Sequence, residues 1–248
     1  MASSIQLICT PIGNLGDISF RAVQSLKSAD LIACEDTRHS SRLLKHLEIE
    51  RKELIALHDH NEGARAGSLV ERALSGERIV FLSDAGTPTI SDPGYRLVNA
   101  CIDAGVTVEV IPGPSAVITA LAGSGLPTDA FYFGGFLPVK SGKRSRILEE
   151  ALARAETSIF FESPYRLLKT LNALRDLDEE RSICVARELT KKFETYHRGT
   201  APQILEEFEE KTVKGEITLL IQGAGREKRK ARNEGGEARQ DSASISSL

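Results

Sequence analysis

Short apolar runs alternate with longer amphipathic segments through the first 112 residues of the chain. The apolar runs predict buried strands over residues 5–9, 31–34, 54–57, 78–82 and 106–111. The segments between them have apolar side chains at helical spacing, and they predict helices over residues 20–28, 37–47, 62–75 and 95–104. Repeated strand–helix units of this kind predict an α/β fold with a mostly parallel sheet and helices on both of its faces.

Two of these helices carry the clearest boundary and burial signals. Asn61 is expected to cap the helix of residues 62–75, and Gly76 is expected to end it. Its expected buried face comprises Ala66, Leu69, Val70 and Ala73. The corresponding apolar positions of the helix over residues 95–104 are Leu97, Val98, Cys101 and Ile102.

The pattern changes after Pro112. A helix rich in small residues is expected over residues 115–123, and further helices over residues 145–155, 165–174 and 202–211. Longer, more alternating strands are expected over residues 131–133, 158–161, 182–188, 193–199 and 217–222. The short turn between the third and fourth of these strands predicts an antiparallel hairpin. We therefore expect an N-terminal α/β domain over residues 1–112, a C-terminal domain with a mixed sheet over residues 113–222, and a disordered polar tail over residues 223–248.

The connection over residues 83–94 is the strongest functional signal in the chain. It reads Ser-Asp-Ala-Gly-Thr-Pro-Thr-Ile-Ser-Asp-Pro-Gly and joins a predicted strand to a predicted helix. Two prolines and two glycines fix its path and leave backbone groups accessible, while Asp84 and Asp92 supply charge. Open α/β sheets bind ligands where such loops leave the strands. An elaborate structural connection is the alternative, and we favour a binding loop.

Three other segments carry weaker signals. Residues 10–17 form a glycine-bearing loop that matches neither the dinucleotide nor the P-loop pattern, and Asp17 is expected to cap the following helix. Residues 35–38 read Glu-Asp-Thr-Arg, which suits either ion pairing at a helix start or substrate handling. His58 and His60 have no third ligand at a familiar spacing, so we expect no metal.

Composition limits the possible partners. The net charge of −3 gives no general nucleic-acid footprint, so any basic surface must be local. No apolar run has membrane-spanning length and the N-terminus has no signal-peptide pattern, so we expect a cytoplasmic protein without a membrane partner. The cysteines are isolated in apolar segments and are expected to be buried and reduced: Cys9, Cys34, Cys101 and Cys184.

Positive charge gathers in two short stretches. Residues 140–146 read Lys-Ser-Gly-Lys-Arg-Ser-Arg and form either a solvated helix start or a set of phosphate contacts for RNA. Residues 187–192 read Arg-Glu-Leu-Thr-Lys-Lys and add a carboxylate to further positive charge, although a solvated hairpin end is the alternative.

Seven segments together carry a family resemblance, and they span most of residues 5–222 in the family's order. They are residues 10–17, 35–38, 83–94, 112–116, 134–138, 161–166 and 187–191. This set resembles the signature blocks of the bacterial small-subunit ribosomal RNA 2′-O-methyltransferase I family, within the tetrapyrrole methylase superfamily of class III AdoMet methyltransferases. The combination of Ser-Asp-Ala-Gly-Thr-Pro with Pro-Gly-Pro-Ser-Ala is specific, whereas each block alone is weak.

The resemblance implies a two-domain tetrapyrrole-methylase-like fold that binds S-adenosyl-L-methionine in a cleft between the domains, usually as a homodimer. It implies methylation of the ribose 2′-hydroxyl of a cytidine in small-subunit rRNA. By position, the implied cofactor contacts are Leu15, Asp84, Ala85, Gly86, Thr87, Ser115, Ala116, Phe161 and Ala186. Some relatives have a further small C-terminal domain where this sequence has the polar tail, which bears on substrate contacts in that domain and not on the cofactor cleft.

The implied chemistry is mainly a positioning task. The cofactor supplies an activated methyl group, and the protein must align a weakly nucleophilic hydroxyl with it. Our hypothesis is that Glu188 or Lys191 influences the 2′-hydroxyl, while Arg38, Lys140 and Arg144 hold phosphates. Two alternatives remain open: a sister enzyme that methylates a tetrapyrrole or a protein side chain, and a non-catalytic ribosome-assembly factor.

Overall fold

The computed structural model describes residues 3–208 and 212–225. The chain divides into two compact units, Met1–Ala116 and Val117–Leu248, and each is described by itself. The boundary falls after residue 116, whereas the sequence places it after residue 112. The predicted disordered tail lies outside the described residues from residue 226 onward.

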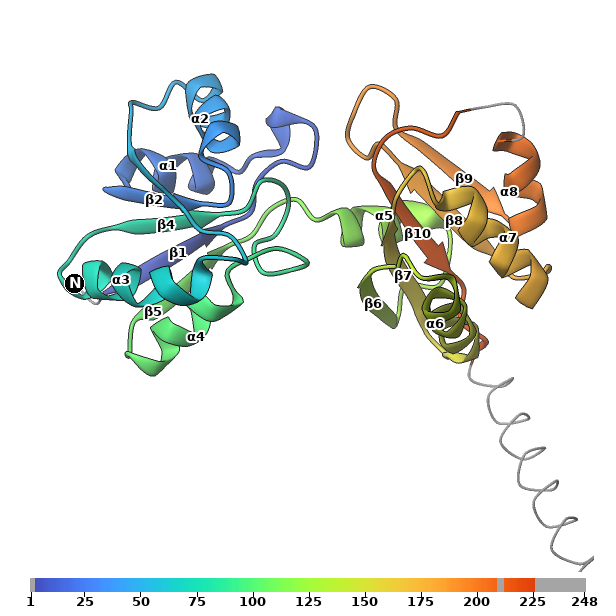
Figure 1. Ribbon diagram of the computed structural model, residues 1–248. Coiled ribbons are helices and arrows are strands. Elements are labelled where there is room, and N and C mark those ends of the chain that lie inside the picture. Colours follow the sequence, from blue (N-terminus) through green and yellow to red (C-terminus); the bar gives the residue numbers. More distant parts are fainter. Residues whose placement is uncertain (1–2, 209–211, 226–248) are drawn as a thin grey trace, which may run out of the picture. The chain divides into compact units, whose positions relative to one another are not determined.

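The first unit is built on a five-stranded sheet in which every pairing is parallel. The strand order is β3-β2-β4-β1-β5 (Figure 1). Its strands are β1 (Ser4–Ile8), β2 (Leu31–Cys34), β3 (Glu53–Ala56), β4 (Ile79–Leu82) and β5 (Thr107–Ile111). Every residue of β2 and β4 is buried, as expected for inner strands that are covered on both faces.

Two hydrophobic clusters show that helices cover both faces of this sheet. The helices are α1 (Phe20–Ser28), α2 (Thr37–His46), α3 (Glu62–Leu74) and α4 (Tyr95–Asp103). Leu69 of α3 and Leu97 of α4 pack in one cluster with Phe81, whereas Leu26 of α1 packs in the other with Val80. Neighbouring strand residues point to opposite faces, so the predicted parallel sheet with two covered faces is confirmed.

The second unit contains a mixed sheet with the order β6-β7-β10-β8-β9 (Figure 1). Its strands are β6 (Phe131–Phe136), β7 (Thr157–Glu162), β8 (Ile183–Arg187), β9 (Thr195–Gly199) and β10 (Ile217–Ile221). Its helices are α5 (Ala116–Ser124), α6 (Ser141–Ala153), α7 (Leu167–Leu177) and α8 (Ala201–Phe208). Only β6 and β7 pair in parallel, and β8 and β9 form the predicted antiparallel hairpin.

One face of the second sheet packs under α6, α7 and α8. Leu148, Leu171 and Ile204 of these helices share a cluster with Phe160 of β7. Phe161, the next residue of β7, therefore belongs to the opposite face. The two faces of this sheet thus differ, and the predicted cofactor contacts of the unit lie away from the main core.

The structure corrects two predicted helix caps. Asp17 lies in a short 3₁₀ helix, η1 (Leu15–Asp17), and the side chain of Ser19 caps α1 instead by accepting from Ala22 N. Asn61 precedes α3 without a side-chain capping bond. Its side chain accepts from His58 N and donates to the carbonyl of Ala56, which fixes the turn between β3 and α3.

The structure also bears on three expectations, about the end of β6, the burial of Ile102 and the state of the cysteines. β6 runs to Phe136 rather than residue 133, because Gly135, at φ 66°, lets the strand continue through an irregular register. Ile102 is 64% exposed and lies off the buried face of α4. The four cysteines are buried and free, as predicted. Among the described residues, the helices are all too short or too polar to cross a membrane.

Candidate functional site

The loops that follow β1 and β4 are tied together at the carboxyl edge of the first sheet. Thr10 and Gly86 exchange two backbone hydrogen bonds, with N···O distances of 2.8 and 3.1 Å. The Thr10 hydroxyl also donates to the carbonyl of Ser83. The first loop and the long loop of residues 83–94 therefore form one unit, as expected for neighbouring parallel strands whose carboxyl ends share an edge.

A buried carboxylate fixes the far end of the long loop. Glu62, 3% exposed at the start of α3, accepts hydrogen bonds from Gly94 N and Leu97 N, both at 3.0 Å. Gly94 has a φ of 122°, and a Cβ there would lie 2.6 Å from the ring of Phe81. The chain can take this close path over the core only with glycine at this position.

The middle of the long loop has a constrained backbone. Thr89 and Ser91 both have positive φ angles, 75° and 62°, which are rare for residues that carry a Cβ. Thr89 N donates to the carbonyl of Pro93, which closes the turn internally. Backbone strain of this kind persists where the surrounding contacts impose it, and it is common at binding sites.

Asp84 links the long loop to the end of β2. Its Oδ1 accepts from Asp36 N at 3.1 Å, while Asp84 N donates to Glu35 Oε2 at 3.4 Å. Glu35 therefore faces the binding loop, and Asp36 instead caps α2 by accepting from Arg38 N. Of the two interpretations of residues 35–38, ion pairing at a helix start holds for Asp36 and Arg38, because their side chains form a salt bridge.

The carboxylates at this edge give it a negative character. Burial, together with the nearby charges of Glu35 and Asp84, raises the pKa of Asp92 to about 6. Burial also raises the pKa of Glu35. Carboxylates that crowd one another disfavour further negative charge nearby, so this edge suits a cationic ligand group better than a phosphate.

The segment that leaves β5 joins the same edge. Cys9 N donates to the carbonyl of Ile111, and the Thr87 hydroxyl donates to the carbonyl of Pro114 at 3.3 Å. A Cβ on Gly113 would lie 2.9 Å from the Cβ of Cys9, so the two backbones pack closely. These bonds place Thr87 of the long loop beside the residue that precedes Ser115 and Ala116.

The remaining predicted contacts of the first unit differ in exposure. Leu15, in η1, is 41% exposed, and Asn14 holds its turn by accepting from Gly16 N. Ala85 is exposed at the tip of the loop, whereas Gly86 is buried by its pairing with Thr10. The structure therefore brings Asp84, Ala85, Gly86 and Thr87 together with the segment before Ser115.

In the second unit, Phe161 and Ala186 lie in one row across the sheet. Thr218 of β10 pairs with Phe161 on one side and with Ala186 on the other. Directly opposed residues point to the same face, which is the face away from α6, α7 and α8. Phe161 also contacts the rings of Phe133 and Phe136, with centroid distances of 5.0 and 5.3 Å.

A carboxylate also organises the turn between β8 and β9. Glu188 Oε1 accepts from Lys191 Nζ at 3.0 Å and from Glu216 N at 2.9 Å. Lys191 forms a second ion pair with Glu216. Glu188 and Thr190 both have positive φ angles, 53° and 64°, so this turn is constrained like the long loop of the first unit.

These contacts set the protonation states of the two predicted catalytic residues. The hydrogen bond from Glu216 N lowers the pKa of Glu188, and the Lys191 ammonium lowers it further. Burial alone would lower the pKa of Lys191, but its pairing with Glu188 and Glu216 outweighs burial and raises it. At neutral pH Lys191 is an ammonium and Glu188 a weakly basic carboxylate, so neither is poised as a strong general base.

The basic stretch of residues 140–146 splits into exposed and buried members. α6 begins at Ser141, four residues earlier than expected, so most of the stretch is helical. Lys140 and Lys143 are exposed, and Arg146 pairs with Glu150. Arg144 is only 6% exposed and donates to the carbonyl of Val139, so the expectation that its guanidinium faces a phosphate conflicts with its position in the fold.

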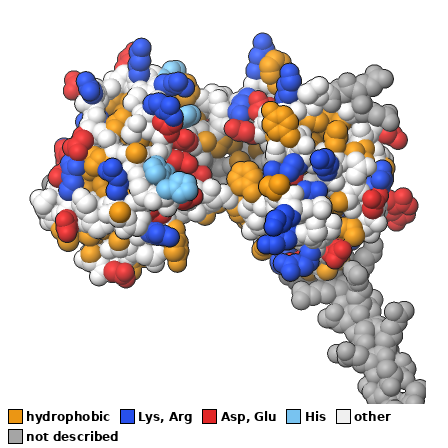
Figure 2. Space-filling view, in the orientation of Figure 1, with side chains coloured by type: hydrophobic (Ala, Val, Ile, Leu, Met, Phe, Trp, Pro, Cys, Tyr) orange, Lys and Arg blue, Asp and Glu red, His pale blue; other side chains and the backbone are white. Residues whose placement is uncertain are grey.

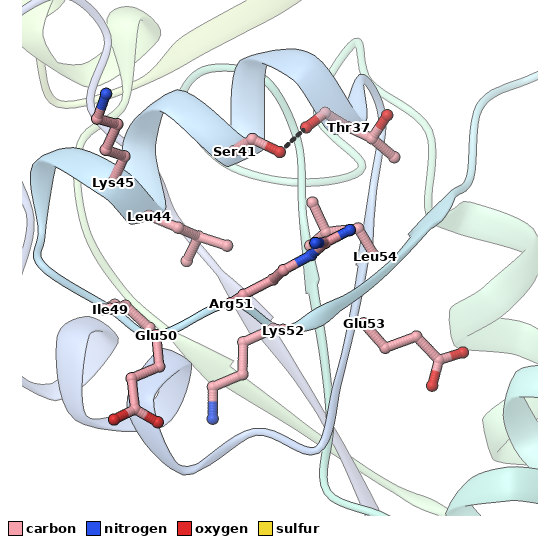
Figure 3. Close-up of a pocket in the computed structure, with 10 residues that line it drawn as sticks. All are labelled: Thr37, Ser41, Leu44, Lys45, Ile49, Glu50, Arg51, Lys52, Glu53 and Leu54. Carbon is pink, nitrogen blue, oxygen red and sulfur yellow. Dashed lines mark hydrogen bonds between the residues drawn. The ribbon is translucent and has the colours of Figure 1, made fainter.

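A separate groove lies beside β3, the outermost strand on one side of the first sheet (Figure 3). It has a volume of about 960 Å³ and lies between α2 and the chain entering β3. Lys45 and Arg51 line it together with Glu50 and Glu53. None of the predicted site residues lines this groove, and its mixed charges favour no single ligand class. Within residues 3–208 and 212–225, no three His, Cys, Asp or Glu side chains are grouped to hold a metal ion.

Sequence reasoning missed the two buried carboxylates that hold the loops. Glu62 anchors the long loop of the first unit, and Glu162, at the end of β7, is its counterpart in the second. Glu162 accepts from Ser163 N, Arg166 Nε and the hydroxyl of Thr170. Glu162 lies in one of the resemblance segments, so its position was available as a signal, whereas nothing in the local sequence marks Glu62 as buried.

Comparison with known proteins gives consistent matches over most of the chain. Residues 4–205 match the family model of Tetrapyrrole (Corrin/Porphyrin) Methylases. A protein of Vibrio cholerae named ribosomal RNA small subunit methyltransferase I is 50% identical over 225 residues, covering 90% of this chain and 78% of its own. A Synechocystis protein of the same name is 48% identical over 226 residues, covering 91% of this chain and 81% of its own.

Solved structures show the same fold at low sequence identity. Uroporphyrin-III-C-methyltransferase from Thermus thermophilus aligns with a TM-score of 0.61 at 18% identity, covering 94% of this chain and 98% of its own. Diphthine synthase aligns with a TM-score of 0.66 at 13% identity, covering 88% of this chain and 90% of its own. At such identities the likeness concerns the fold alone.

Proposed function

We propose, from the premise that the chain belongs to the family of ribosomal RNA small subunit methyltransferase I, that it methylates the ribose 2′-hydroxyl of a cytidine in small-subunit rRNA. The protein is an S-adenosyl-L-methionine-dependent methyltransferase, as its family and its tetrapyrrole methylase fold establish. The choice of a ribose hydroxyl on a cytidine is the finer part of the proposal.

The negative edge of the first sheet is the observation that carries the cofactor assignment. S-adenosyl-L-methionine supplies a methyl group on a positively charged sulfonium. Glu35, Asp84 and Asp92 form a carboxylate cluster beside a loop with accessible backbone groups, which favours a cationic ligand. We assign Asp84, Ala85, Gly86 and Thr87 to this ligand, together with Leu15, Ser115 and Ala116.

Phe161 and Ala186 remain proposed cofactor contacts in the second unit. Their shared row on the sheet face away from the three packed helices supports the assignment. Phe161 offers a half-buried ring and Ala186 a small side chain. Thr218 lies between the two residues and Ala186 is fully buried, so the ring of Phe161 is the surface that a flat heterocycle would contact.

For the reacting hydroxyl, the charge states favour Lys191 as an electrostatic group rather than a base. An ammonium held by Glu188 and Glu216 can stabilise the negative charge that the ribose oxygen carries once its proton has passed to solvent water. Glu188 then acts as a positioning residue for Lys191. Arg38 and Lys140 are exposed and remain proposed phosphate contacts, whereas the buried Arg144 contributes to the start of α6.

The oligomeric state and the location of the protein are also proposed. We expect it to act as a homodimer in the cytoplasm, where its rRNA substrate is located. Light scattering of the purified protein tests the oligomeric state: a mass of twice 27.0 kDa is expected, and a monomer would contradict the expectation.

Transfer of a radiolabelled methyl group tests the activity. Purified protein is incubated with labelled S-adenosyl-L-methionine and small ribosomal subunits from a strain that lacks the gene. Label is expected in the rRNA for the wild type and is expected to be absent for Asp84→Arg, because the new guanidinium repels the cationic donor. Label in a supplied tetrapyrrole or in protein, with none in rRNA, would instead support the sister activities.

A non-catalytic assembly factor makes a different prediction for the same variant. If Asp84→Arg abolishes cofactor binding and yet restores subunit assembly in the deletion strain, the protein acts as an assembly factor. We expect Asp84→Arg to leave the rRNA of that strain unmethylated.

A further inference from the structure

The carboxyl ends of β6, β7 and β8 meet at one edge of the second sheet, together with the amino ends of β9 and β10. The registers establish this, because Phe136 pairs with Phe161, and Ile217 pairs with both Glu162 and Arg187. Thr195, the first residue of β9, also pairs with Arg187. Side chains far apart in the sequence therefore gather along this edge.

Aromatic side chains stand out from this edge into solvent. Tyr165 is 90% exposed, and Phe136 and Phe193 are each 63% exposed. Phe136 ends β6, Tyr165 follows β7 and Phe193 precedes β9, so each belongs to the same edge. We call these three residues the aromatic edge. The three rings are spread along these strand ends from β6 to β9, and exposed apolar side chains along one surface mark a surface for binding.

The backbone that carries these rings is held in place by hydrogen bonds. The buried Glu162 accepts from Ser163 N at 2.7 Å and from Arg166 Nε at 3.0 Å, which fixes the turn that presents Tyr165. Leu137 N donates to the carbonyl of Phe161, which fixes the segment after Phe136. Hydrogen bonds thus hold the backbone that carries Tyr165 and Phe136, which lowers the entropy lost on binding.

Positive charge accompanies the rings. Lys140 and Lys143 follow β6, and both are exposed. Lys192 lies next to Phe193, with its Nζ 5.5 Å from the ring centroid. Figure 2 shows hydrophobic and basic side chains side by side on the visible face of this unit. Aromatic faces beside lysines suit unstacked nucleobases and the phosphates that join them.

From these observations we infer that the aromatic edge binds single-stranded rRNA by stacking bases on Tyr165 and Phe193, with Phe136 on the β6 side of the same strand ends. This role rests on the proposed function and deepens it, because a strand whose bases are stacked on fixed rings has its 2′-hydroxyls held in place, which the alignment with a methyl donor requires. Tyr165 and Phe193 are positioning residues that hold nucleotides of the substrate strand, and they act separately from the carboxylate cluster of the first unit.

The test compares four variants in methylation of small subunits from a strain that lacks the gene. Tyr165→Ala and Phe193→Ala remove a ring, and each is expected to raise KM for the subunit about fivefold or more, since one stacked base contributes about 1–3 kcal/mol. Tyr165→Phe keeps the ring and is expected to stay within about twofold of the wild type. Phe131→Ala is the matched control, because Phe131 is 42% exposed at the opposite end of β6 and lies outside the aromatic edge.

Two further readouts separate base stacking from effects on cofactor binding and on oligomeric state. Calorimetric titration with S-adenosyl-L-methionine is expected to give wild-type affinity for all four variants, and light scattering is expected to give the wild-type mass. The inference is wrong if Phe131→Ala raises KM as much as Tyr165→Ala does, if the ring removals act only on cofactor affinity, or if they change the oligomeric state instead of KM. An inactive wild type would contradict the proposed function, whereas an active wild type with unchanged KM for Tyr165→Ala and Phe193→Ala contradicts the stacking role alone.

Discussion

The carboxyl edge of the first sheet and the aromatic edge of the second sheet present opposite chemistry. The first gathers the carboxylates of Glu35, Asp84 and Asp92 around a loop with constrained backbone. The second gathers exposed rings such as Tyr165 beside lysines such as Lys140. The net charge of the chain is only −3, so the difference between the two edges is local, and we propose that one favours a cationic methyl donor and the other a polyanionic strand.

Both edges nonetheless depend on the same structural device. Glu62 accepts from two backbone amides at the end of the long loop, and Glu162 accepts from a backbone amide, a guanidinium and a hydroxyl at the start of α7. A buried carboxylate is stable only when its oxygens are satisfied. Each edge therefore has one internal side chain whose loss should affect that edge and spare the other.

Gly94→Ala should have the largest effect on stability and on cofactor binding. The added Cβ meets the ring of Phe81 at 2.6 Å and φ is 122°, so we expect about 3 kcal/mol or more of lost unfolding free energy and loss of cofactor binding. Gly76→Ala is the matched control, because φ is 98° there and nothing lies within 4 Å of the added Cβ. We expect it to lose about 1–2 kcal/mol from backbone strain alone and to keep cofactor affinity. Urea denaturation and calorimetry measure both, and equal losses for the two variants would show that the close packing at Gly94 is unimportant.

The two carboxylate anchors should separate the two edges. Glu62→Leu should weaken S-adenosyl-L-methionine binding about tenfold or more while leaving KM for the small subunit nearly unchanged, because it removes the acceptor of both backbone amides and loosens the long loop only. Glu162→Gln should do the reverse, since it removes the charge paired with Arg166 and loosens the turn that carries Tyr165. Each should lower the unfolding free energy by about 1–3 kcal/mol, as expected for a disturbed buried hydrogen-bond network.

Calorimetry and steady-state kinetics on both anchor variants provide the readouts. If both variants weaken cofactor and subunit equally, the two edges are not independent, and the comparison between them fails.

The carboxylate cluster of Glu35, Asp84 and Asp92 should respond to pH through Asp92. Its pKa is raised by burial from 3.8 to about 6, so the neutral form is favoured in the folded state. The stability that this contributes is complete below about pH 4 and is lost as the pH rises through 6. Asp92→Asn should therefore raise Tm at about pH 8 and leave it nearly unchanged at about pH 4. If Tm shifts equally at both pH values, the titration of Asp92 is not the cause.

The same group should influence cofactor affinity in the opposite direction. Ionised Asp92 favours a cationic ligand, so affinity for S-adenosyl-L-methionine should fall several-fold between about pH 7.5 and pH 5.5 in the wild type. Asp92→Asn should bind several-fold more weakly than the wild type at the higher pH and should lose most of this pH dependence. Isothermal titration at the two pH values provides the comparison, and an unchanged slope in Asp92→Asn would assign the pH dependence to another group.

The smallest effect should come from Arg144, despite its place in the basic stretch. Its guanidinium is buried, and the side-chain Nε has no hydrogen-bond partner among the described residues. Arg144→Met should therefore leave both stability and KM for the subunit close to wild type, since an apolar side chain of similar length suits a buried site. Lys140→Ala should raise KM several-fold and reduce the salt dependence of binding by about one unit of slope, as expected for a single phosphate contact. If Arg144→Met instead reduces the salt dependence and Lys140→Ala does not, the assignment of the two residues is reversed.

Most helices and strands could be predicted from local patterns in the sequence. The bounds of α1 and β2 agree with the prediction, and the buried face of α3 contains all four expected side chains. These features depend on periodicity within a few residues, which the sequence displays directly. The order of strands and the irregular register after Phe133 depend on distant pairings, and no local pattern encodes them.

The candidate site could be located from sequence but not built from it. The glycines and prolines of residues 83–94 predict a binding loop. The carboxylate that anchors this loop, Glu62, is distant in the chain, and the sequence around it does not mark it as buried. The burial of Arg144 depends on how α6 packs, and its neighbours in sequence are exposed. The family resemblance supplied the proposed cofactor contacts, which stay predictions, whereas tertiary packing decides which charges face solvent.

Mass spectrometry of nucleosides tests the central claim most directly. Small subunits from a strain that lacks the gene are incubated with the purified protein and S-adenosyl-L-methionine that carries a deuterated methyl group, and the rRNA is then digested to nucleosides. We predict one labelled product, a cytidine with the deuterated methyl group on its ribose, and no label when Asp84→Arg replaces the wild type. Label on a base, or on a nucleoside other than cytidine, would contradict the assignment of the reaction.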